Sequence, residues 1–106
     1  MVTFPISVGR DSYRGNDARK RSKTAQNNRD AIALEQAAND LLLNQEEPIR
    51  SYRWHELCQA SGLSLDTVKR LGFSIDCGHN GYTAIKPGLS FDEATNLLRQ
   101  EPPSAQ

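Results

Sequence analysis

The residues best suited to chemistry are basic side chains grouped near the start of the chain. Residues 1–29 hold seven basic and two acidic side chains, a net charge of +5, whereas the remaining residues hold six basic and eleven acidic ones. Four of these cations are close together in sequence: Arg19, Lys20, Arg21 and Lys23. Such charges neutralise phosphates, and a basic segment on an acidic body is typical of nucleic-acid binding. We expect phosphate contacts from these four residues, although a solvated, unfolded leader has the same composition.

Two histidines and two cysteines are the candidate metal ligands. His55 and Cys58 are one helical turn apart if they lie on a helix, and Cys77 and His79 are separated by one residue. Zinc binds both ligand types. The second spacing is not a common zinc motif, however, and cysteine is often buried without any metal. We therefore expect no metal site, and two cysteines do not make a disulfide framework.

No grouping of residues indicates catalysis. The chain has no glycine-rich phosphate loop and no HExxH motif, its serines lack an activating context, and its carboxylates are scattered. We expect neither enzymatic activity nor a cofactor. The chain also has no apolar run long enough to span a bilayer and no signal-peptide segment, so we expect a cytoplasmic protein without a membrane partner.

The first element able to position these residues is an amphipathic helix over residues 30–45. Its residue types favour a helix. Its apolar residues recur at helical spacing: Ala31, Leu34, Ala38, Leu41 and Leu42. Asn28 or Asp30 can cap its start, and Pro48 marks its end.

The residues before this helix are expected to be largely unfolded. Residues 9–28 are polar and bury too little apolar surface to offset the entropy of ordering. Residues 2–8 alternate apolar and polar side chains, which fits an edge strand, because Pro5 lacks a donor, or a loose end. The chain is thus divided into a disordered basic tail over 1–29, a folded domain over 30–100 and a flexible tail over 101–106.

Two short helices are predicted next, over residues 54–61 and 64–71. Gly62 supplies the turn between them, and Gly72 is suited to be the left-handed residue that ends the second helix. Aromatic residues at these places more often pack in or near the core than stack on bases. We expect this of Tyr52, Trp54 and Phe73.

Strands are predicted on either side of these helices. Residues 49–51 fit a brief strand. Residues 73–77 alternate apolar and polar side chains, and a second alternating run follows Asn80-Gly81, which together predict a β-hairpin. A capping box from Ser90 to Glu93 then predicts a last helix over residues 90–100.

The segment Trp54–Phe73, WHELCQASGLSLDTVKRLGF, resembles the helix-turn-helix unit of bacterial regulators. With the order of the other elements, the chain resembles the winged helix-turn-helix family. Two crossing helices need a small residue, a turn glycine and inward apolar residues. Those positions are filled by Leu57, Cys58, Gly62, Leu63, Val68 and Leu71. Ser61 departs from the pattern where an apolar residue is common, and Arg53 takes a cap position without being a capping residue.

The resemblance implies an α+β fold, mostly helical, with three core helices, a β-hairpin wing and a C-terminal helix. In this family the second helix of the unit enters the major groove. The residues implied to face DNA there are Ser64, Leu65, Asp66, Thr67, Lys69 and Arg70. Arg70 would bind guanine, and Lys69 guanine or phosphate. At the wing tip, His79 and Asn80 would contact the minor groove or a phosphate.

The function implied by the resemblance is that of a small DNA-binding transcription regulator of the bacterial or phage type. The family often forms homodimers, and the helices over 30–45 and 90–100 are the candidate dimer surfaces. The acidic body and a wing tip without lysine or arginine leave a second function open. In it, the same fold is an adaptor that binds a protein partner without touching DNA.

Overall fold

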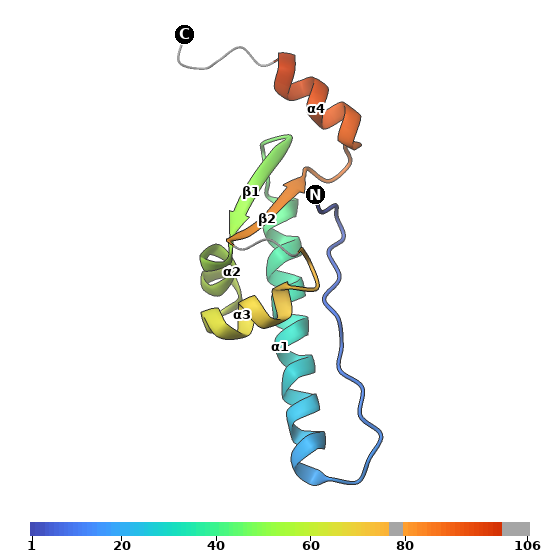
Figure 1. The fold of residues 1–106 in the computed structure, drawn as a ribbon. Helices are drawn as coiled ribbons and strands as arrows, with labels where there is room; N and C mark the ends of the chain where they lie inside the picture. The colour runs from blue at the N-terminus through green and yellow to red at the C-terminus, as the bar shows by residue number, and fades with distance from the viewer. Residues whose placement is uncertain (77–79, 101–106) are drawn as a thin grey trace.

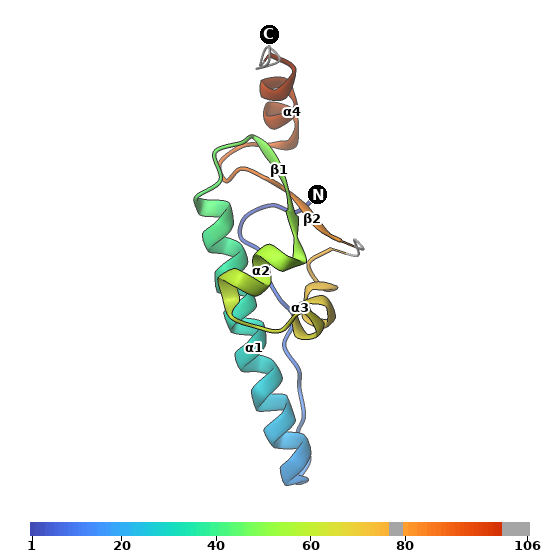
Figure 2. The ribbon, with the colours of Figure 1, turned by 90° about the vertical axis from the view of Figure 1, so that its left-hand side faces the viewer.

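A long helix forms the axis of the molecule. The computed structural model describes residues 1–76 and 80–100. Helix α1 spans Ala18–Leu43, and one of its faces is covered by the other elements (Figure 1). The buried residues of that face are Ala31, Leu34, Ala37, Ala38 and Leu42. The first turns of α1 project beyond the shorter helices, so the molecule is elongated (Figures 1 and 2).

Helix α1 begins earlier than the sequence pattern indicates, and the expected start near residue 30 is wrong. Asp17 is the N-cap, and its carboxylate accepts hydrogen bonds from the backbone N–H groups of Arg19 (2.9 Å) and Lys20 (3.3 Å). Residues 18–29 contain no glycine or proline and favour a helix. They bury no apolar face, so hydrophobic periodicity gives no signal there. This part of the expected disordered tail is therefore helical.

Residues 1–17 run as an extended segment alongside α1 (Figure 1). Ile6 and Val8 are 5% and 2% exposed and belong to the hydrophobic core. Asn39 on α1 fixes the backbone of Ile6, accepting from its N–H (2.6 Å) and donating to its carbonyl (3.0 Å). Ile6 and Val8 thus face the core, as the strand-like period predicts, whereas Phe4 of the same alternating set is exposed. The expectation of a disordered start is wrong.

Glu35 on α1 makes a second attachment of this segment. Its Oε1 accepts from the N–H of Val8 (3.0 Å), and its Oε2 pairs with Arg10 Nη2 (3.1 Å). These contacts, the Val8 hydrogen bond first, lower the pKa of Glu35 against the opposing effect of burial. The charged form of Glu35 therefore holds the N-terminal segment in place.

The sheet has two antiparallel strands, β1 (Ile49–Arg53) and β2 (Gly81–Ile85). The register places Tyr52 opposite Tyr82, and their rings stack with centroids 5.2 Å apart. On the other face, the hydroxyls of Ser51 and Thr83 are hydrogen-bonded at 3.0 Å. Near the start of the chain, Val2 forms a parallel bridge to β2. The brief strand expected at 49–51 is confirmed and extends to Arg53.

The hairpin expected between residues 73–77 and the run after Gly81 is wrong over its described part. Residues 73–76 form a turn, because the N–H groups of Ile75 and Asp76 both donate to the carbonyl of Gly72 and keep the chain coiled. Cys77, the last residue of the expected strand, lies outside the described residues. β2 instead pairs with β1, which lies on the other side of the two short helices.

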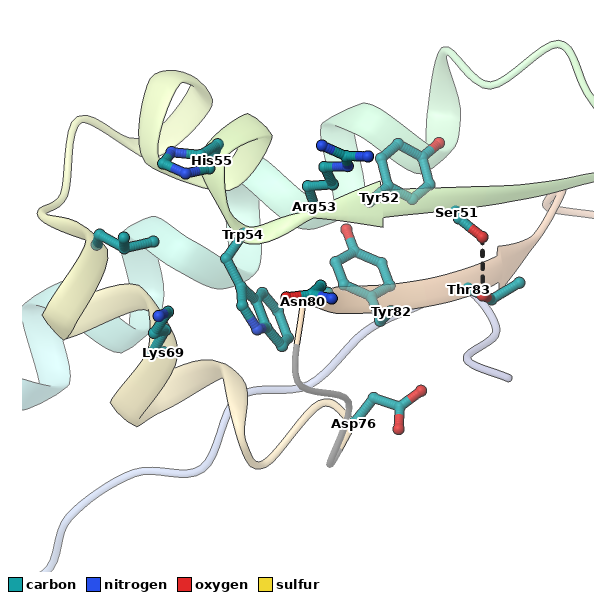
Figure 3. A pocket seen from close by; sticks show the side chains of 12 residues that line it. Ser51, Tyr52, Arg53, Trp54, His55, Lys69, Asp76, Asn80, Tyr82 and Thr83 are labelled. Atoms are coloured by element: carbon teal, nitrogen blue, oxygen red, sulfur yellow. Dashed lines mark hydrogen bonds between the residues drawn. The ribbon is translucent and has the colours of Figure 1, made fainter.

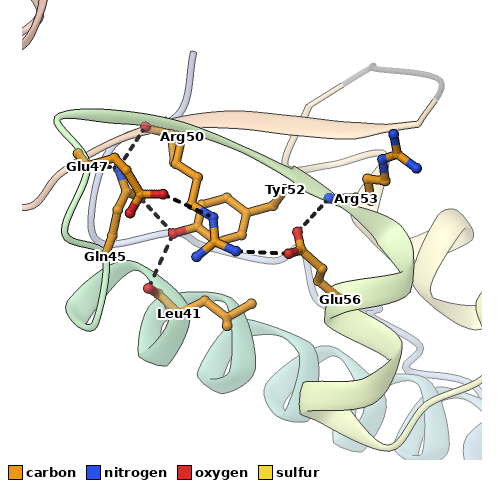
Figure 4. Close-up of polar contacts among 8 residues, drawn as sticks. Leu41, Gln45, Glu47, Arg50, Tyr52, Arg53 and Glu56 are labelled. Atoms are coloured by element: carbon orange, nitrogen blue, oxygen red, sulfur yellow. Dashed lines mark hydrogen bonds and ion pairs between the residues drawn. The ribbon is translucent and has the colours of Figure 1, made fainter. Parts of the chain in front are cut away.

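A polar network ties the end of α1 to both strands (Figure 4). Tyr52 donates from its hydroxyl to Gln45 Oε1 (2.7 Å), and Gln45 Nε2 donates to the carbonyl of Ala84 (3.2 Å). Gln45 is only 3% exposed. Because buried amides are costly when unpaired, these bonds fix the position of the sheet on α1.

The two short helices are α2 (Trp54–Ser61) and α3 (Leu65–Gly72). Gly62 lies between them with φ +76°, and its N–H donates to the carbonyl of Cys58 (2.9 Å). Leu57 and Val68 are fully buried, and Leu71 packs against the same core. The predicted turn and inward face are thus confirmed.

The start of α2 and the end of α3 differ from expectation in detail. Arg53 is the N-cap of α2, and its backbone N–H donates to Glu56 Oε2 (2.9 Å), so Glu56 supplies the cap that the arginine side chain lacks. Gly72 is helical, not left-handed. It is needed for space, since a Cβ there would lie 2.9 Å from the ring of Trp54.

Helix α4 spans Phe91–Gln100 at the opposite end of the molecule from the start of α1 (Figure 1). The capping box is confirmed: Glu93 N–H donates to Ser90 Oγ (3.1 Å), and Ser90 N–H lies 3.4 Å from Glu93 Oε1. Ala94 is its one buried residue. The described part of the chain is thus a small α+β fold, and residues 101–106, expected to be flexible, lie outside it.

Candidate nucleic-acid interface

The outward face of α3 carries the charged residues expected to read DNA. Asp66, Lys69 and Arg70 are exposed, whereas Leu65 and Thr67 are half-buried. Within residues 1–76 and 80–100, none of the three charged groups has an ion-pair partner. The face therefore presents a net charge of +1 to solvent, with both cations toward the end of the helix.

Two of the expected reading residues are used by α3 itself. Ser64 Oγ accepts from the backbone N–H of Thr67 (3.3 Å) and donates to Thr67 Oγ1 (2.9 Å). This confirms Ser64 as the helix cap. Both hydroxyls are engaged by the cap, so a base contact from either residue would disturb it.

Phe73 extends this face by almost one turn. Its backbone is helical (φ −56°, ψ −29°), and it follows Lys69 by four positions and Arg70 by three, which places all three on one side. Phe73 is 67% exposed, so the expectation that it packs near the core is wrong. A signal was available in the sequence, because an inward face made by Val68 and Leu71 turns residue 73 outward.

A cleft of about 670 Å³ lies between α3 and the sheet, and we call it the sheet–α3 cleft (Figure 3). Its polar side chains come from both strands, both helices and the segment between α3 and β2. They are Ser51, Arg53, His55, Lys69, Asp76, Asn80 and Thr83. Arg53 and Lys69 contribute two positive charges and Asp76 one negative charge. The cleft is therefore polar and weakly basic, suited to hydrogen-bonding an anion or a base edge.

A second cleft of about 410 Å³ lies between α1, α3 and the N-terminal segment, and we call it the α1–α3 cleft. Its cations are Lys20, Lys23 and Arg70, and Arg70 Nη1 donates to Asn27 Oδ1 on α1 (3.3 Å). Its other lining residues are Asp11, Ser12, Tyr13, Thr24 and Asn27. Two of the four expected phosphate-binding residues of the basic segment thus line the same cleft as Arg70. The other two, Arg19 and Arg21, are exposed but do not line the cleft.

The remaining candidates are placed only in part. Asn80 is exposed at the sheet–α3 cleft, and its carbonyl accepts from the N–H of Trp54 (3.1 Å). His79 lies outside the described residues, as does Cys77. His55 is exposed and Cys58 is half-buried as a free thiol. Among the residues that the structure describes, no three potential metal ligands converge.

Two buried tyrosines, Tyr52 and Tyr82, also line the sheet–α3 cleft (Figure 3). Burial raises the pKa of Tyr52, against the opposing charge of Arg50, and burial also raises the pKa of Tyr82. The Tyr82 hydroxyl is buried and has no hydrogen-bond partner in the described part of the chain. Both groups therefore stay protonated, and their rings support the strands that border the cleft.

Comparison with protein-family models, with curated proteins and with solved structures finds no match, so any assignment of function depends on this geometry. A search of the described residues for a helix both long and apolar enough to cross a bilayer finds none.

Proposed function

We propose that this protein binds duplex DNA and presents the outward face of α3 to the major groove. The observation that carries the proposal is the position of α3 between two clefts that each hold basic side chains. Lys69 lines the sheet–α3 cleft and Arg70 the α1–α3 cleft, so the helix contributes one cation to each cleft beside its outward face. A helix between two basic clefts can enter the major groove while the cations of the clefts contact the phosphates that border the groove.

The distribution of charge answers the main objection, which is the acidic composition of residues 30–106. Two arginines lie in ion pairs: Arg10 with Glu35, and Arg50 with Glu47 (3.6 Å) and Glu56 (3.0 Å). These pairs occupy three carboxylates away from the outward face of α3. The cations beside α3 have no ion pair within the described ranges, so they are available to an anionic partner.

The order of elements supports a winged helix-turn-helix domain as the finer description. β1 lies between α1 and the pair α2–α3, and β2 follows α3, which matches part of the order in that family. In this proposal Asn80, next to the start of β2, acts in the place of the wing. A small transcription regulator of the bacterial or phage type, acting in the cytoplasm, is the role we assign to such a domain.

The test is a comparison of two charge-removing variants on a preferred duplex selected from a random pool. Lys69→Ala should weaken binding by about 1–3 kcal/mol and relax the sequence preference, because Lys69 lies on the reading face. Arg99→Ala removes the same charge from exposed α4 and should change affinity little. Equal effects of the two variants would show that α3 is not the reading element.

A second function, that of a protein-binding adaptor, is favoured by α4. Its exposed apolar residues Phe91, Leu97 and Leu98 are 54%, 42% and 42% exposed. Homodimerisation would use the same surface, whereas the apolar face of α1 is already buried in the core. If Lys69→Ala leaves DNA affinity unchanged and Leu97→Glu abolishes binding of a protein partner, the adaptor function replaces the DNA-binding one.

A further inference from the structure

We infer that the α1–α3 cleft is a binding site for a phosphate of the DNA backbone, and that Arg70 serves this site instead of reading a base. The inference rests on the proposed function for the identity of the ligand. It differs from the sequence-based expectation, in which Arg70 binds guanine and the basic segment is an unfolded tail. The structure joins these two parts of the chain in one cleft.

The first support is the convergence of three cations from distant parts of the sequence. Lys20 and Lys23 are one turn apart on α1, and Arg70 lines the same cleft from α3. Within the described residues none of them has a carboxylate partner at ion-pair distance. Three positive charges and one carboxylate face this cleft, so the cations repel each other, and a bound phosphate reduces that repulsion.

The second support is the way in which the cleft is held in shape. Asn27 accepts from Arg70 Nη1 (3.3 Å) and donates to Asp11 Oδ2 (2.6 Å), while Asn28 accepts from the Asp11 N–H (2.7 Å). The ammonium of Lys20 lies 5.9 Å from the ring centroid of Tyr13. The guanidinium is thus oriented by one bond and keeps its other donors for a ligand.

Asp11 is the one carboxylate in the cleft and opposes an anion. Its Oδ2 is occupied by Asn27, and the cleft keeps a net charge of +2 with all four ionised groups counted. A single phosphodiester, with one negative charge, is therefore attracted. The cleft adjoins the reading face of α3, so a backbone phosphate at the edge of the groove is the ligand that can reach it.

The test uses the intact chain and two matched double variants. Lys20→Gln with Lys23→Gln removes two charges from the cleft, and Arg19→Gln with Arg21→Gln removes two charges from the same turns outside it. All four residues are exposed, so circular dichroism should show unchanged melting. Affinity for a labelled duplex is measured by fluorescence anisotropy from about 50 to about 200 mM salt.

The cleft variant should lower the magnitude of the slope of log K against log salt by about 0.9, because the one phosphate contact of the cleft is lost. Over that salt range the wild-type chain should lose about three- to fourfold more affinity than the cleft variant. Adding Arg70→Gln to the cleft variant should cost less than adding it to the wild-type chain, since the three cations share one ligand. Arg70→Gln should also weaken the affinity for all DNA sequences equally. Equal slopes for the two double variants, or a relaxed sequence preference on Arg70→Gln, would overturn the inference.

If the wild-type chain binds no duplex at low salt, the proposed function fails. Binding of inorganic phosphate then tests whether the cleft is a phosphate site. Phosphate should shift the backbone NMR signals of residues 11–13, 20–27 and 70 in the wild-type chain and leave them unshifted in the cleft variant. Shifts of this kind would support the phosphate site even though the chain does not bind DNA. Their absence in the wild-type chain would overturn the site as well.

Discussion

Replacing Gly72 by alanine should destabilise the protein, although alanine is the better helix former. The added Cβ would lie 2.9, 3.1 and 3.3 Å from three ring carbons of Trp54, so the ring would have to retreat by about 0.5 Å to reach ordinary contact. Trp54 is 4% exposed and packs at 5.6 Å between centroids on Tyr82, which leaves it little room.

The magnitude follows from two opposing effects. Overpacking of a core costs about 1–3 kcal/mol, and the helix propensity of alanine over glycine returns about 1 kcal/mol. We expect a net loss of about 1 kcal/mol, which lowers the Tm by about 4–8 °C in a domain of this size. Trp54 is the one tryptophan of the chain, so urea unfolding followed by its fluorescence reports the change directly.

The control replaces the ring that the new methyl group would meet. In a Trp54→Leu background the clash is removed, so Gly72→Ala should become stabilising by about 1 kcal/mol, measured by circular dichroism. A Gly72→Ala variant that is as stable as the wild-type chain would refute the close approach of α3 to Trp54. The same result would remove the reason for a small residue at this position.

The other predictions concern the turn, the tyrosine pair and the N-terminal segment. Gly62→Ala should destabilise the protein by about 1 kcal/mol because of the positive φ at this position, while Gly62→Asn should cost less. Thermal unfolding measures both variants, and equal costs would contradict a left-handed turn. Tyr82→Phe should leave the free energy of unfolding unchanged or raise it, since the lost hydroxyl has no partner among the described residues. Tyr52→Phe should cost about 1–3 kcal/mol, because it leaves the buried amide oxygen of Gln45 without its donor. Urea unfolding compares the two variants, and a larger loss for Tyr82→Phe than for Tyr52→Phe would disprove this network. The pKa of Glu35 is lowered below its ordinary value of 4.5, so its contribution to the free energy of unfolding is present above that pH and is lost as pH falls through the folded-state pKa. Acid unfolding of Glu35→Gln should therefore depend less steeply on pH than that of the wild-type chain. Identical acid profiles would count against the Val8 hydrogen bond.

The elements that sequence reasoning located best are those with a strong local signal. The turn at Gly62, the cap at Ser64 and the capping box at Ser90 each depend on a few neighbouring residues, and all are found. The first turns of α1 give no such signal, because residues 18–29 have no apolar face. Helix propensity and the Asp17 cap gave the only signal there, and a search for apolar periodicity does not detect them.

The partner of β2 could not be read from local sequence. An Asn-Gly pair between alternating runs favours a hairpin, yet the strand that pairs with Gly81–Ile85 lies some thirty residues earlier. That pairing is selected by the stacked rings of Tyr52 and Tyr82, a contact that only the folded chain reveals. The same holds for the α1–α3 cleft, which needs the packing of two distant helices.

The most direct test of DNA binding by α3 and its flanking clefts is a salt titration of the whole chain on a labelled duplex. Five cations lie in the two clefts: Lys20, Lys23, Arg53, Lys69 and Arg70. If the three cations of the α1–α3 cleft share one phosphate, Arg53 meets a second and Lys69 reads a base, log K should fall linearly with log salt with a slope of about −1.8. No binding at about 50 mM salt, or an affinity that does not change with salt, would contradict the account.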